Sequence, residues 1–200
     1  MNITAQKNEL IFNYSGGKLG EAKSLFTSMY LYLNSIAQKK ASIFDNMLAE
    51  NFNELKGVGL KKLKYTDCIK TSNLKTHSKN ISNNPINRLV GDFNNINWKT
   101  IYKGFKEFNI KVNDNDSVKL IKMDPGTSVP LHSHNGKEYI LVLEGSFCDE
   151  YGEYNKGDMQ INDQKIKHNP IASISNGCVC LSITENDVVF FGKFGSFLNL

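Results

Sequence analysis

The sequence predicts an α+β protein in which a short helical domain precedes a closed β-barrel. In the first third of the chain, apolar residues recur at the spacing of helix faces. After Pro85, short apolar runs alternate with turn residues, which is the pattern of an all-β unit. A stretch rich in serine, threonine, asparagine and lysine lies between them and is typical of a linker. We therefore expect a helical domain at residues 1–65, a polar linker at 66–84 and a β-barrel at 85–200.

The helical domain is predicted to contain a short helix and two longer ones. The short helix covers Leu10–Tyr14 and should end at Gly16-Gly17, because glycine commonly terminates helices. The second is predicted from about Glu21 to Lys39, where apolar residues form one continuous stripe. The third is predicted from about Ser42 to Leu55.

The second half of the chain predicts a series of short strands that can close on themselves and bury a pocket. These strands are Trp98–Phe105, Ile110–Val112, Val118–Met123, Ser128–His132, Tyr139–Glu144, Gly145–Glu150, Asp158–Ile161, Ile171–Ser175, Val179–Thr184 and Val188–Phe191.

Three of the four histidines fall in one constellation. His132 and His134 are two residues apart, so both rings point to the same face of a strand. Asn135-Gly136 favours a turn, after which Glu138 starts an apolar strand that runs back, and His168 arrives from a separate strand. Three imidazoles and one carboxylate suit one divalent metal ion, whether zinc, iron, manganese or nickel. The sequence therefore predicts a metal site at these four residues.

Cys178 and Cys180 are also two residues apart on a predicted strand, so their thiols should face the same way. They are candidates for redox-sensing thiols or for further metal ligands near the barrel mouth. The alternative is that they are two small apolar residues of the core, which free cysteine often is.

The composition excludes several classes of function. A net charge of +4 is too small to predict nucleic-acid binding. The amino-terminal segment lacks the apolar core of a signal peptide, and no stretch approaches the roughly 20 apolar residues of a membrane span. The 4 cysteines form no C-x-x-C pair and no disulfide framework, which favours a reducing compartment. We therefore expect a cytoplasmic protein that contacts neither membranes nor nucleic acids directly.

The metal constellation resembles the first motif of the cupin barrels, which are double-stranded β-helices, or jelly rolls. That motif is matched without a gap as Gly126-x5-His132-x-His134-x3-Glu138-x6-Gly145. In the second cupin motif, Gly157 and His168 match. Three positions depart from it, namely Asp163 in place of proline, Lys165 in place of glycine and Ala172 in place of asparagine.

Further segments resemble the ChrR-type zinc anti-sigma factors. They are Val129-Pro-Leu-His132, Leu143-Glu-Gly-Ser-Phe147, Asp149-Glu-x-Gly-Glu-Tyr154 and Gly177-Cys-Val-Cys180. The resemblance implies that the helical domain binds and occludes an extracytoplasmic-function (ECF) sigma factor. It also implies that the cupin half carries a zinc ion and responds to stress.

The helical domain departs from that family at its own zinc site. The family places His-x3-Cys-x2-Cys on the long helix, and here these positions hold Tyr30, Asn34 and Ala37. Because these side chains make no zinc site, apolar contact from Tyr30, Leu33 and Ala37 is expected to replace the contribution of the metal. Together with Asn34, these three residues form the predicted partner-binding surface, which consists of Tyr30, Leu33, Asn34 and Ala37.

The leading prediction is therefore an anti-sigma factor with a metal-bound cupin as its sensor, and zinc is the expected metal. One alternative is a metal-dependent cupin oxygenase, in which iron would leave open positions for dioxygen and substrate. Another is a cupin whose helical appendage mediates dimerisation.

Overall fold

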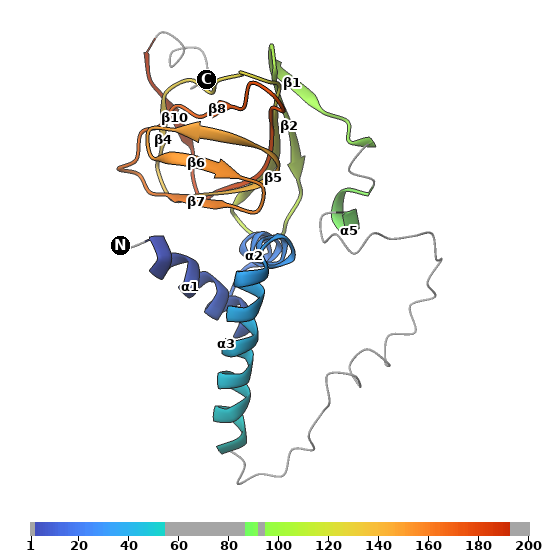
Figure 1. Ribbon diagram of the computed structural model, residues 1–200, viewed down its shortest axis with the longest axis vertical. Helices are drawn as coiled ribbons and strands as arrows, with labels where there is room; N and C mark the ends of the chain where they lie inside the picture. Colours follow the sequence, from blue (N-terminus) through green and yellow to red (C-terminus); the bar gives the residue numbers. More distant parts are fainter. Residues whose placement is uncertain (1–2, 55–86, 92–94, 193–200) are drawn as a thin grey trace.

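The computed structural model describes residues 3–54, 87–91 and 95–192. Three helices, α1 (Ile3–Ser15), α2 (Glu21–Leu33) and α3 (Ser35–Glu54), lie beside a β-barrel, and the short α5 (Asn87–Val90) precedes its first strand (Figure 1). The predicted order of helices followed by a β-barrel is confirmed. The predicted linker at residues 66–84 lies outside the described residues. Among the residues described, no helix combines the length and apolar character needed to cross a membrane.

The helix boundaries differ from the prediction at Asn34. A single helix was expected from Glu21 to Lys39, but Asn34 is extended, with φ −124° and ψ 104°, and separates α2 from α3. Its side-chain Oδ1 accepts a hydrogen bond from the backbone N–H of Ala37 at 3.0 Å. Asparagine commonly caps a helix in this way, so its short polar side chain ends one helix and starts the next. As a result α3 points away from the barrel (Figure 1).

All strand pairs are antiparallel. The strands are β1 (Lys99–Tyr102), β2 (Phe105–Ile110), β3 (Ser117–Met123), β4 (His132–His134), β5 (Glu138–Asp149), β6 (Gly152–Asn155), β7 (Met159–Asn162), β8 (Ile171–Ala172), β9 (Cys178–Thr184) and β10 (Val188–Phe190). The larger sheet has the order β1-β2-β3-β9-β5-β6, with β7 and β8 also paired to β5, and β10 pairs with β4 in a second sheet.

Several strand predictions need correction. Trp98–Phe105 was predicted as one strand and Ile110–Val112 as the next, but β1 ends at Tyr102 and β2 runs from Phe105 to Ile110. The strand predicted at Ser128–His132 is β4, at His132–His134. The strand after Asn135-Gly136 was expected to run back beside the strand that carries His132, but β4 pairs with β10 instead, so the turn connects two sheets. The strand β6 was not predicted.

The strand β5 also differs, because Tyr139–Glu144 and Gly145–Glu150 were predicted as two strands and form one. Its first half pairs with β7 and β9, and its second half pairs with β6 and β8. The strand changes register near Gly145, where φ is +68°. A Cβ at this position would collide with the carbonyl oxygen of Gly177, so only glycine fits. This explains physically why the motif ends in a glycine.

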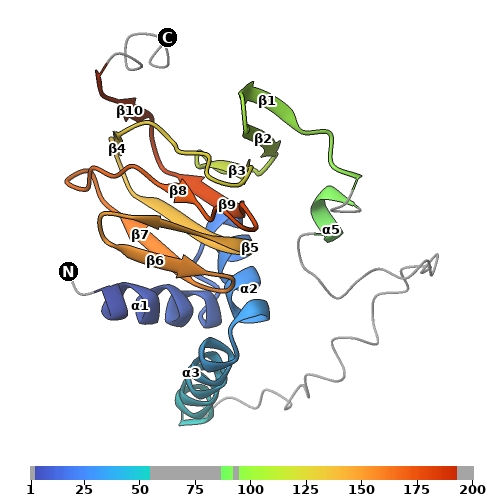
Figure 2. The ribbon, with the colours of Figure 1, turned by 45° about the horizontal axis from the view of Figure 1, so that its top comes forward.

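The helices and the barrel share one hydrophobic core. Phe26 and Met29 of α2 belong to the same buried cluster as Leu141 of β5 and Leu181 of β9. The fully buried Phe26 ring packs edge-on against Tyr139, with 5.9 Å between ring centroids. Figure 2 shows α2 directly against the sheet, with α1 alongside. The helical segment is thus built on the barrel surface.

A barrel loop also completes the amino-terminal end of α2. Gly20 precedes the helix and has no side chain that could cap it. Instead Asp114, between β2 and β3, accepts a hydrogen bond from the backbone N–H of Ala22 at 2.9 Å. A carboxylate stabilises the exposed N–H groups and positive dipole at a helix start. Next to it, Glu21 accepts two hydrogen bonds from Asn113.

Candidate metal centre

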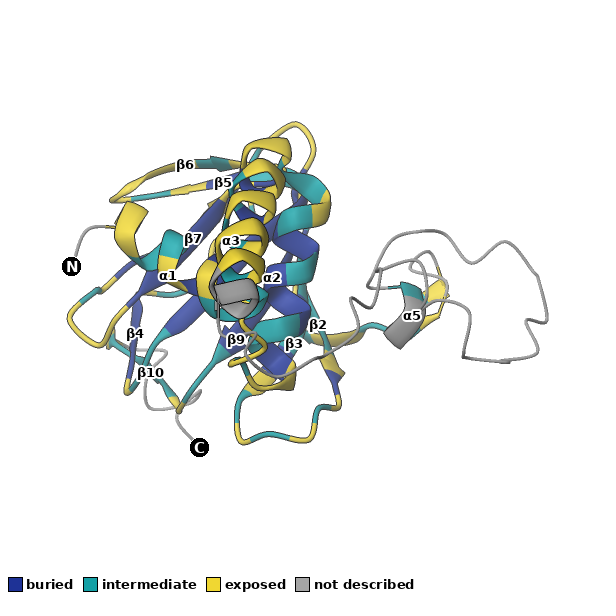
Figure 3. Cartoon of the chain, turned by 90° about the horizontal axis from the view of Figure 1, so that it is seen from below, coloured by how far each residue is buried: buried dark blue, intermediate teal, exposed yellow. Residues whose placement is uncertain are grey.

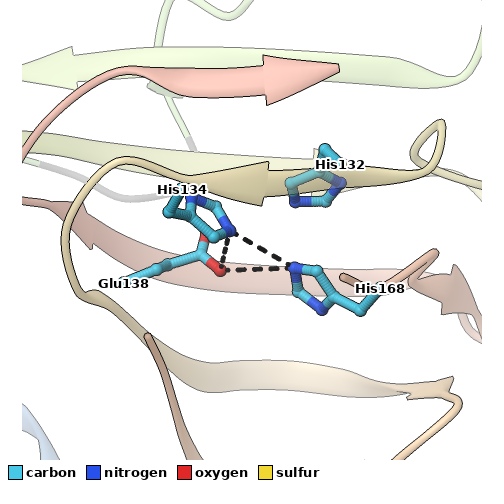
Figure 4. A group of neighbouring side chains, drawn as sticks. All are labelled: His132, His134, Glu138 and His168. Atoms are coloured by element: carbon cyan, nitrogen blue, oxygen red, sulfur yellow. Dashed lines mark hydrogen bonds and ion pairs between the residues drawn. The ribbon is translucent and has the colours of Figure 1, made fainter. Parts of the chain in front are cut away.

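Three segments bring the four predicted metal ligands together (Figure 4). His132 and His134 lie on β4, Glu138 is the first residue of β5, and His168 comes from the loop between β7 and β8. The backbones of His132 and His168 hold each other through two hydrogen bonds, of 3.1 and 3.0 Å. All four residues are buried. His168 was expected on a separate strand, but it forms a single β-bridge with His132 of β4.

The distances between the side chains fit one shared cation. One ligand atom from each residue lies within 4.8 Å of the others. The Nε2 atoms of His134 and His168 are 3.4 Å apart, and Glu138 Oε2 lies 3.0 Å and 3.5 Å from them. Ligands placed tetrahedrally at about 2.1 Å from a metal are roughly 3.4 Å apart. The distances among His134, Glu138 and His168 match this value, and His132 completes a buried group that could hold a divalent metal ion.

Two of the three imidazoles are oriented by hydrogen bonds on their outer nitrogen. His132 Nδ1 lies 2.8 Å from the carbonyl oxygen of Pro130, and His168 Nδ1 lies 3.0 Å from Asp149 Oδ2. Donation from Nδ1 leaves Nε2 unprotonated, as a metal ligand must be. His134 differs, because its Nδ1 is buried without a hydrogen-bond partner among the described residues.

Burial and neighbouring charges shift the pKa values of three of the four candidate ligands. Burial raises the pKa of the Glu138 carboxyl, but hydrogen bonds with His134 and His168 outweigh burial and lower it far below its usual range. Burial lowers the pKa of His132 to about 4, so this ring is neutral at pH 7. Burial also disfavours the charged form of His168, but Asp149 and Glu138 outweigh it and raise the pKa to about 9. A metal ion would compete with this proton.

A hydrogen-bonded chain of polar side chains surrounds the ligands. Asn162 Nδ2 donates to Glu138 Oε2 at 3.1 Å and also to Gln160 Oε1 at 3.3 Å. Gln160 Nε2 then donates to Asp149 at 2.7 Å, and Asp149 holds His168. The chain thus ties two ligands from different segments together, which limits their movement.

Gln160 and Asn162 were not predicted as site residues, although the alternation of polar and apolar residues around them could have indicated them. On β7 they alternate with Met159 and Ile161, so the polar residues share one face. All four residues are buried, which shows that the polar face points into the protein and not to solvent.

A cavity of about 1030 Å³ opens onto the site. His132, Glu138 and Cys180 line it together with mainly apolar side chains such as Ile140 and Phe147. The candidate metal site is therefore open to small molecules on one side.

Cys178 and Cys180 lie side by side on β9, with their Sγ atoms 3.3 Å apart. Both are buried in a second core cluster, which includes Val142 and Phe147. Neither belongs to the group of four candidate metal ligands. A hydrogen bond with Cys178, together with burial, raises the pKa of the Cys180 thiol well above its ordinary value.

The structure places the four predicted partner-binding residues at the junction of α2, α3 and the barrel. Tyr30 and Ala37 are buried in the shared core, and Leu33 packs against it. Asn34 caps α3 and donates a hydrogen bond from Nδ2 to the carbonyl oxygen of Gly157 at 3.5 Å. Tyr30, Leu33 and Ala37 thus make the expected apolar contacts, whereas Asn34 makes polar ones.

Comparison with known proteins agrees with this architecture. A family model described as the ChrR cupin-like domain matches residues 87–186, which is half of the chain. The chain belongs to the ChrR cupin-like family. The predicted cupin fold of the barrel is thereby confirmed.

One comparison of sequences and one of structures extend the likeness to the helices. The anti-sigma-E factor ChrR of Cereibacter sphaeroides is 26% identical over 197 residues, covering 94% of this chain and 91% of its own. A crystal structure of Rhodobacter sphaeroides SigE in complex with the anti-sigma ChrR matches with a TM-score of 0.73 and 27% identity. That match covers 88% of this chain and 96% of the other, so it includes both the helices and the barrel.

Proposed function

We propose that this chain is an anti-sigma factor, which binds an ECF sigma factor through its helices and uses the cupin barrel as a sensor. The observation that carries the proposal is the extent of the structural match. A chain named as an anti-sigma factor, crystallised with its sigma factor, matches this chain over the helices and the barrel together. Many unrelated proteins share a cupin barrel, but the added helices make the likeness specific.

The helix α3 offers the surface for this partner. Ile36 is 67% exposed and Ile43 is 57% exposed, and their spacing of seven residues places them on one helix face. Most of α3 is exposed, whereas the side of α2 that faces the barrel is buried (Figure 3). Exposed apolar residues on one face commonly mark a binding surface for another protein.

The four residues first predicted to bind the partner border the proposed surface or hold its helices in place. Leu33 and Asn34 are half-buried beside the start of α3, where they border the proposed surface. Tyr30 and Ala37 are buried and act indirectly, because they fix α2 and α3 against the barrel.

Binding of the cognate sigma factor by the full-length chain tests the proposal. The full chain is needed because the helices share their core with the barrel. Titration calorimetry should show binding with a dissociation constant in the micromolar range or below. Ile43→Asp should weaken it at least about tenfold, since it would place an unpaired charge in an apolar contact, which is costly to bury.

Ile174→Asp is the matched control, because Ile174 is 86% exposed on the barrel. It should leave the affinity unchanged. If the wild-type chain shows no binding at micromolar concentration, the proposal is wrong. If both variants weaken binding equally, the surface on α3 is wrong.

We propose zinc as the ion of the candidate metal centre, held by His132, His134, Glu138 and His168. Four protein ligands would fill all four coordination positions of a tetrahedral zinc ion, as in structural zinc sites. When bound, zinc would link β4, β5 and the loop after β7 by bonds stronger than hydrogen bonds. Metal analysis of protein purified without added metal should find about one zinc per chain. Iron together with oxygen consumption would instead favour an oxygenase.

We further propose that Cys178 and Cys180 are oxidant-sensing thiols. Their Sγ atoms need to approach from 3.3 Å to about 2.05 Å to form a disulfide. Cys180 lines the cavity, so a small oxidant can reach it, but its raised pKa keeps the thiol protonated and should make the reaction slow. Hydrogen peroxide would take up two electrons and the two thiol protons, giving one S–S bond and two water molecules.

Mass spectrometry of the peroxide-treated protein tests this sensor. The peptide that contains both cysteines should lose two hydrogen masses, and Cys178→Ser should prevent the loss. Oxidation at the exposed Cys148 alone would refute the assignment.

A further inference from the structure

One carboxylate, Glu185, connects the helix α2 with the strand that carries a candidate metal ligand. Glu185 lies between β9 and β10 and forms an ion pair with Lys23 of α2, with 2.8 Å between Oε1 and Nζ. Its other oxygen, Oε2, accepts a hydrogen bond from the backbone N–H of Lys137 at 3.1 Å. Its own N–H donates to the carbonyl oxygen of Lys137 at 3.0 Å. The carboxylate therefore binds the helix and the start of β5 at the same time.

Glu185 also contacts the residue on the other side of Glu138. The hydroxyl of Tyr139 donates to Glu185 Oε1 at 3.4 Å, so the residues before and after Glu138 are both bonded to Glu185. Successive residues of a strand point to opposite faces. Glu138 thus faces the metal site while Tyr139 faces α2.

The Tyr139 ring adds a second route between the helix and β5. Phe26 of α2 packs against it edge-on, and Lys23 Nζ lies 5.6 Å from its centroid. A shift of β5 at Glu138 would therefore displace groups that touch two residues of α2.

We propose that Glu185 and Lys23 are positioning residues that couple occupancy of the metal site to the placement of α2. The inference rests on the proposed function only in requiring a metal at this site. A bound metal fixes Glu138, and with it Lys137 and Tyr139, which hold the Glu185 carboxylate in reach of Lys23. By thermodynamic reciprocity, the ion pair on the helix must then strengthen metal binding.

The coupling can be separated from the attachment of the helix. Asp114 and Asn113 hold the first turn of α2 through contacts that do not involve β5. Phe26 remains buried beside Leu141 and Leu181. Removing the charge of Lys23 should therefore leave α2 docked and weaken its response to the metal, because the contact of Phe26 with Tyr139 remains.

Zinc affinity of the full-length chain, measured by competition with a chromophoric chelator, tests the proposal. Lys23→Met removes the helix side of the ion pair, together with a longer ion pair of 3.5 Å to Asp116, without touching any metal ligand. It should weaken zinc binding about three- to tenfold, and Glu185→Gln should have a similar effect. The double variant should be no weaker than the single ones, because both remove the same link.

Glu107→Gln is the matched control. Glu107 forms an ion pair of 3.0 Å with Lys119 on the same barrel, and both partners lie on barrel strands. Its loss should leave zinc affinity within about twofold. A purely structural role for Lys23 would lower the melting temperature of the zinc-free and zinc-bound protein equally and leave the affinity unchanged.

Hydrogen exchange of α2 supplies the reciprocal measurement. Zinc should slow exchange of α2 amides in the wild-type chain, and Lys23→Met should reduce this difference. The proposal is overturned if Lys23→Met binds zinc as tightly as the wild type, or if zinc slows exchange equally in both. No zinc binding at all would also overturn it. Neither measurement uses a sigma factor, so failure of sigma binding would leave this result standing.

Discussion

Replacing Asp149 by asparagine should weaken metal binding although Asp149 is not itself a candidate ligand. The Asp149 side chain has no exposed surface, and its Oδ2 accepts hydrogen bonds from His168 at 3.0 Å and Gln160 at 2.7 Å. Its Oδ1 accepts the backbone N–H of Tyr151 at 2.9 Å. In either orientation, the asparagine amide would turn a donor toward another donor. A buried donor that is left without an acceptor costs about 1–3 kcal/mol.

The expected loss of zinc affinity is about 10- to 100-fold, as for other hydrogen-bond partners of metal-binding histidines. This corresponds to about 1.4–2.7 kcal/mol. Chelator competition at pH 7 measures it, and circular dichroism of the metal-free protein checks that the variant folds. Glu150→Gln is the control, because this neighbouring carboxylate is exposed and, within the described part of the chain, accepts the backbone N–H of Asn169. An affinity of Asp149→Asn within twofold of the wild type would refute the reasoning.

Three further predictions concern the helical segment. Phe26→Ala should lower the free energy of unfolding by about 3–5 kcal/mol, because the ring is fully buried against the barrel. Urea titration measures this loss, and a value below about 1 kcal/mol would contradict the shared core. Asn34→Ala should cost about 1 kcal/mol by thermal unfolding, since it removes the cap on Ala37, whereas an unchanged melting temperature would argue against that cap. Burial raises the pKa of Glu185, but the hydrogen bond with Lys23 outweighs it and lowers the pKa below the ordinary 4.5. The stabilisation from this ion pair is therefore complete well above pH 4.5 and is lost as the pH falls below about 4.5. The difference in melting temperature between the metal-free wild type and Glu185→Gln should stay constant from about pH 7 to pH 5 and narrow below about pH 4.5, and a difference that does not narrow there would exclude this ion pair as its source.

The candidate metal site could be predicted from the sequence because its information is local. The two-residue spacing of His132 and His134 sets a common face, and the turn at Asn135-Gly136 returns the chain to Glu138. Only His168 required a distant segment. The spacing identified the side chains that meet, although the pairing of β4 with β10 was predicted wrongly.

The helix boundaries show where local patterns mislead. Asn34 lies within an apolar stripe that continues past it, so spacing alone indicates one long helix. What ends α2 is a hydrogen bond from the backbone of Ala37 to the asparagine side chain. Short polar side chains compete with helix hydrogen bonds in this way, and the outcome depends on where the following helix packs.

The docking of α2 on the barrel could not be predicted from any motif. The Asp114 cap joins residues that are 92 positions apart, and the contact of Lys23 with Glu185 spans still more of the chain. Such contacts leave no periodic signal, because each depends on one residue in a loop. The apolar stripe predicted a buried face of the helix but did not identify the surface that buries it.

The curvature of β5 has a consequence for how the site tolerates change. Glu138 and Asp149 stand at opposite ends of this strand, and a straight strand of its length would hold them about 36 Å apart. Yet both carboxylates reach the same imidazole of His168, at 3.5 Å and 3.0 Å. The strand must therefore bend sharply between its two ends, and the register shift between Val142 and Glu144 and the positive φ of Gly145 lie within this bend. A change in the bend would move both carboxylates relative to the ring, so the backbone in the middle of β5 contributes to the geometry of a centre whose residues lie at its ends.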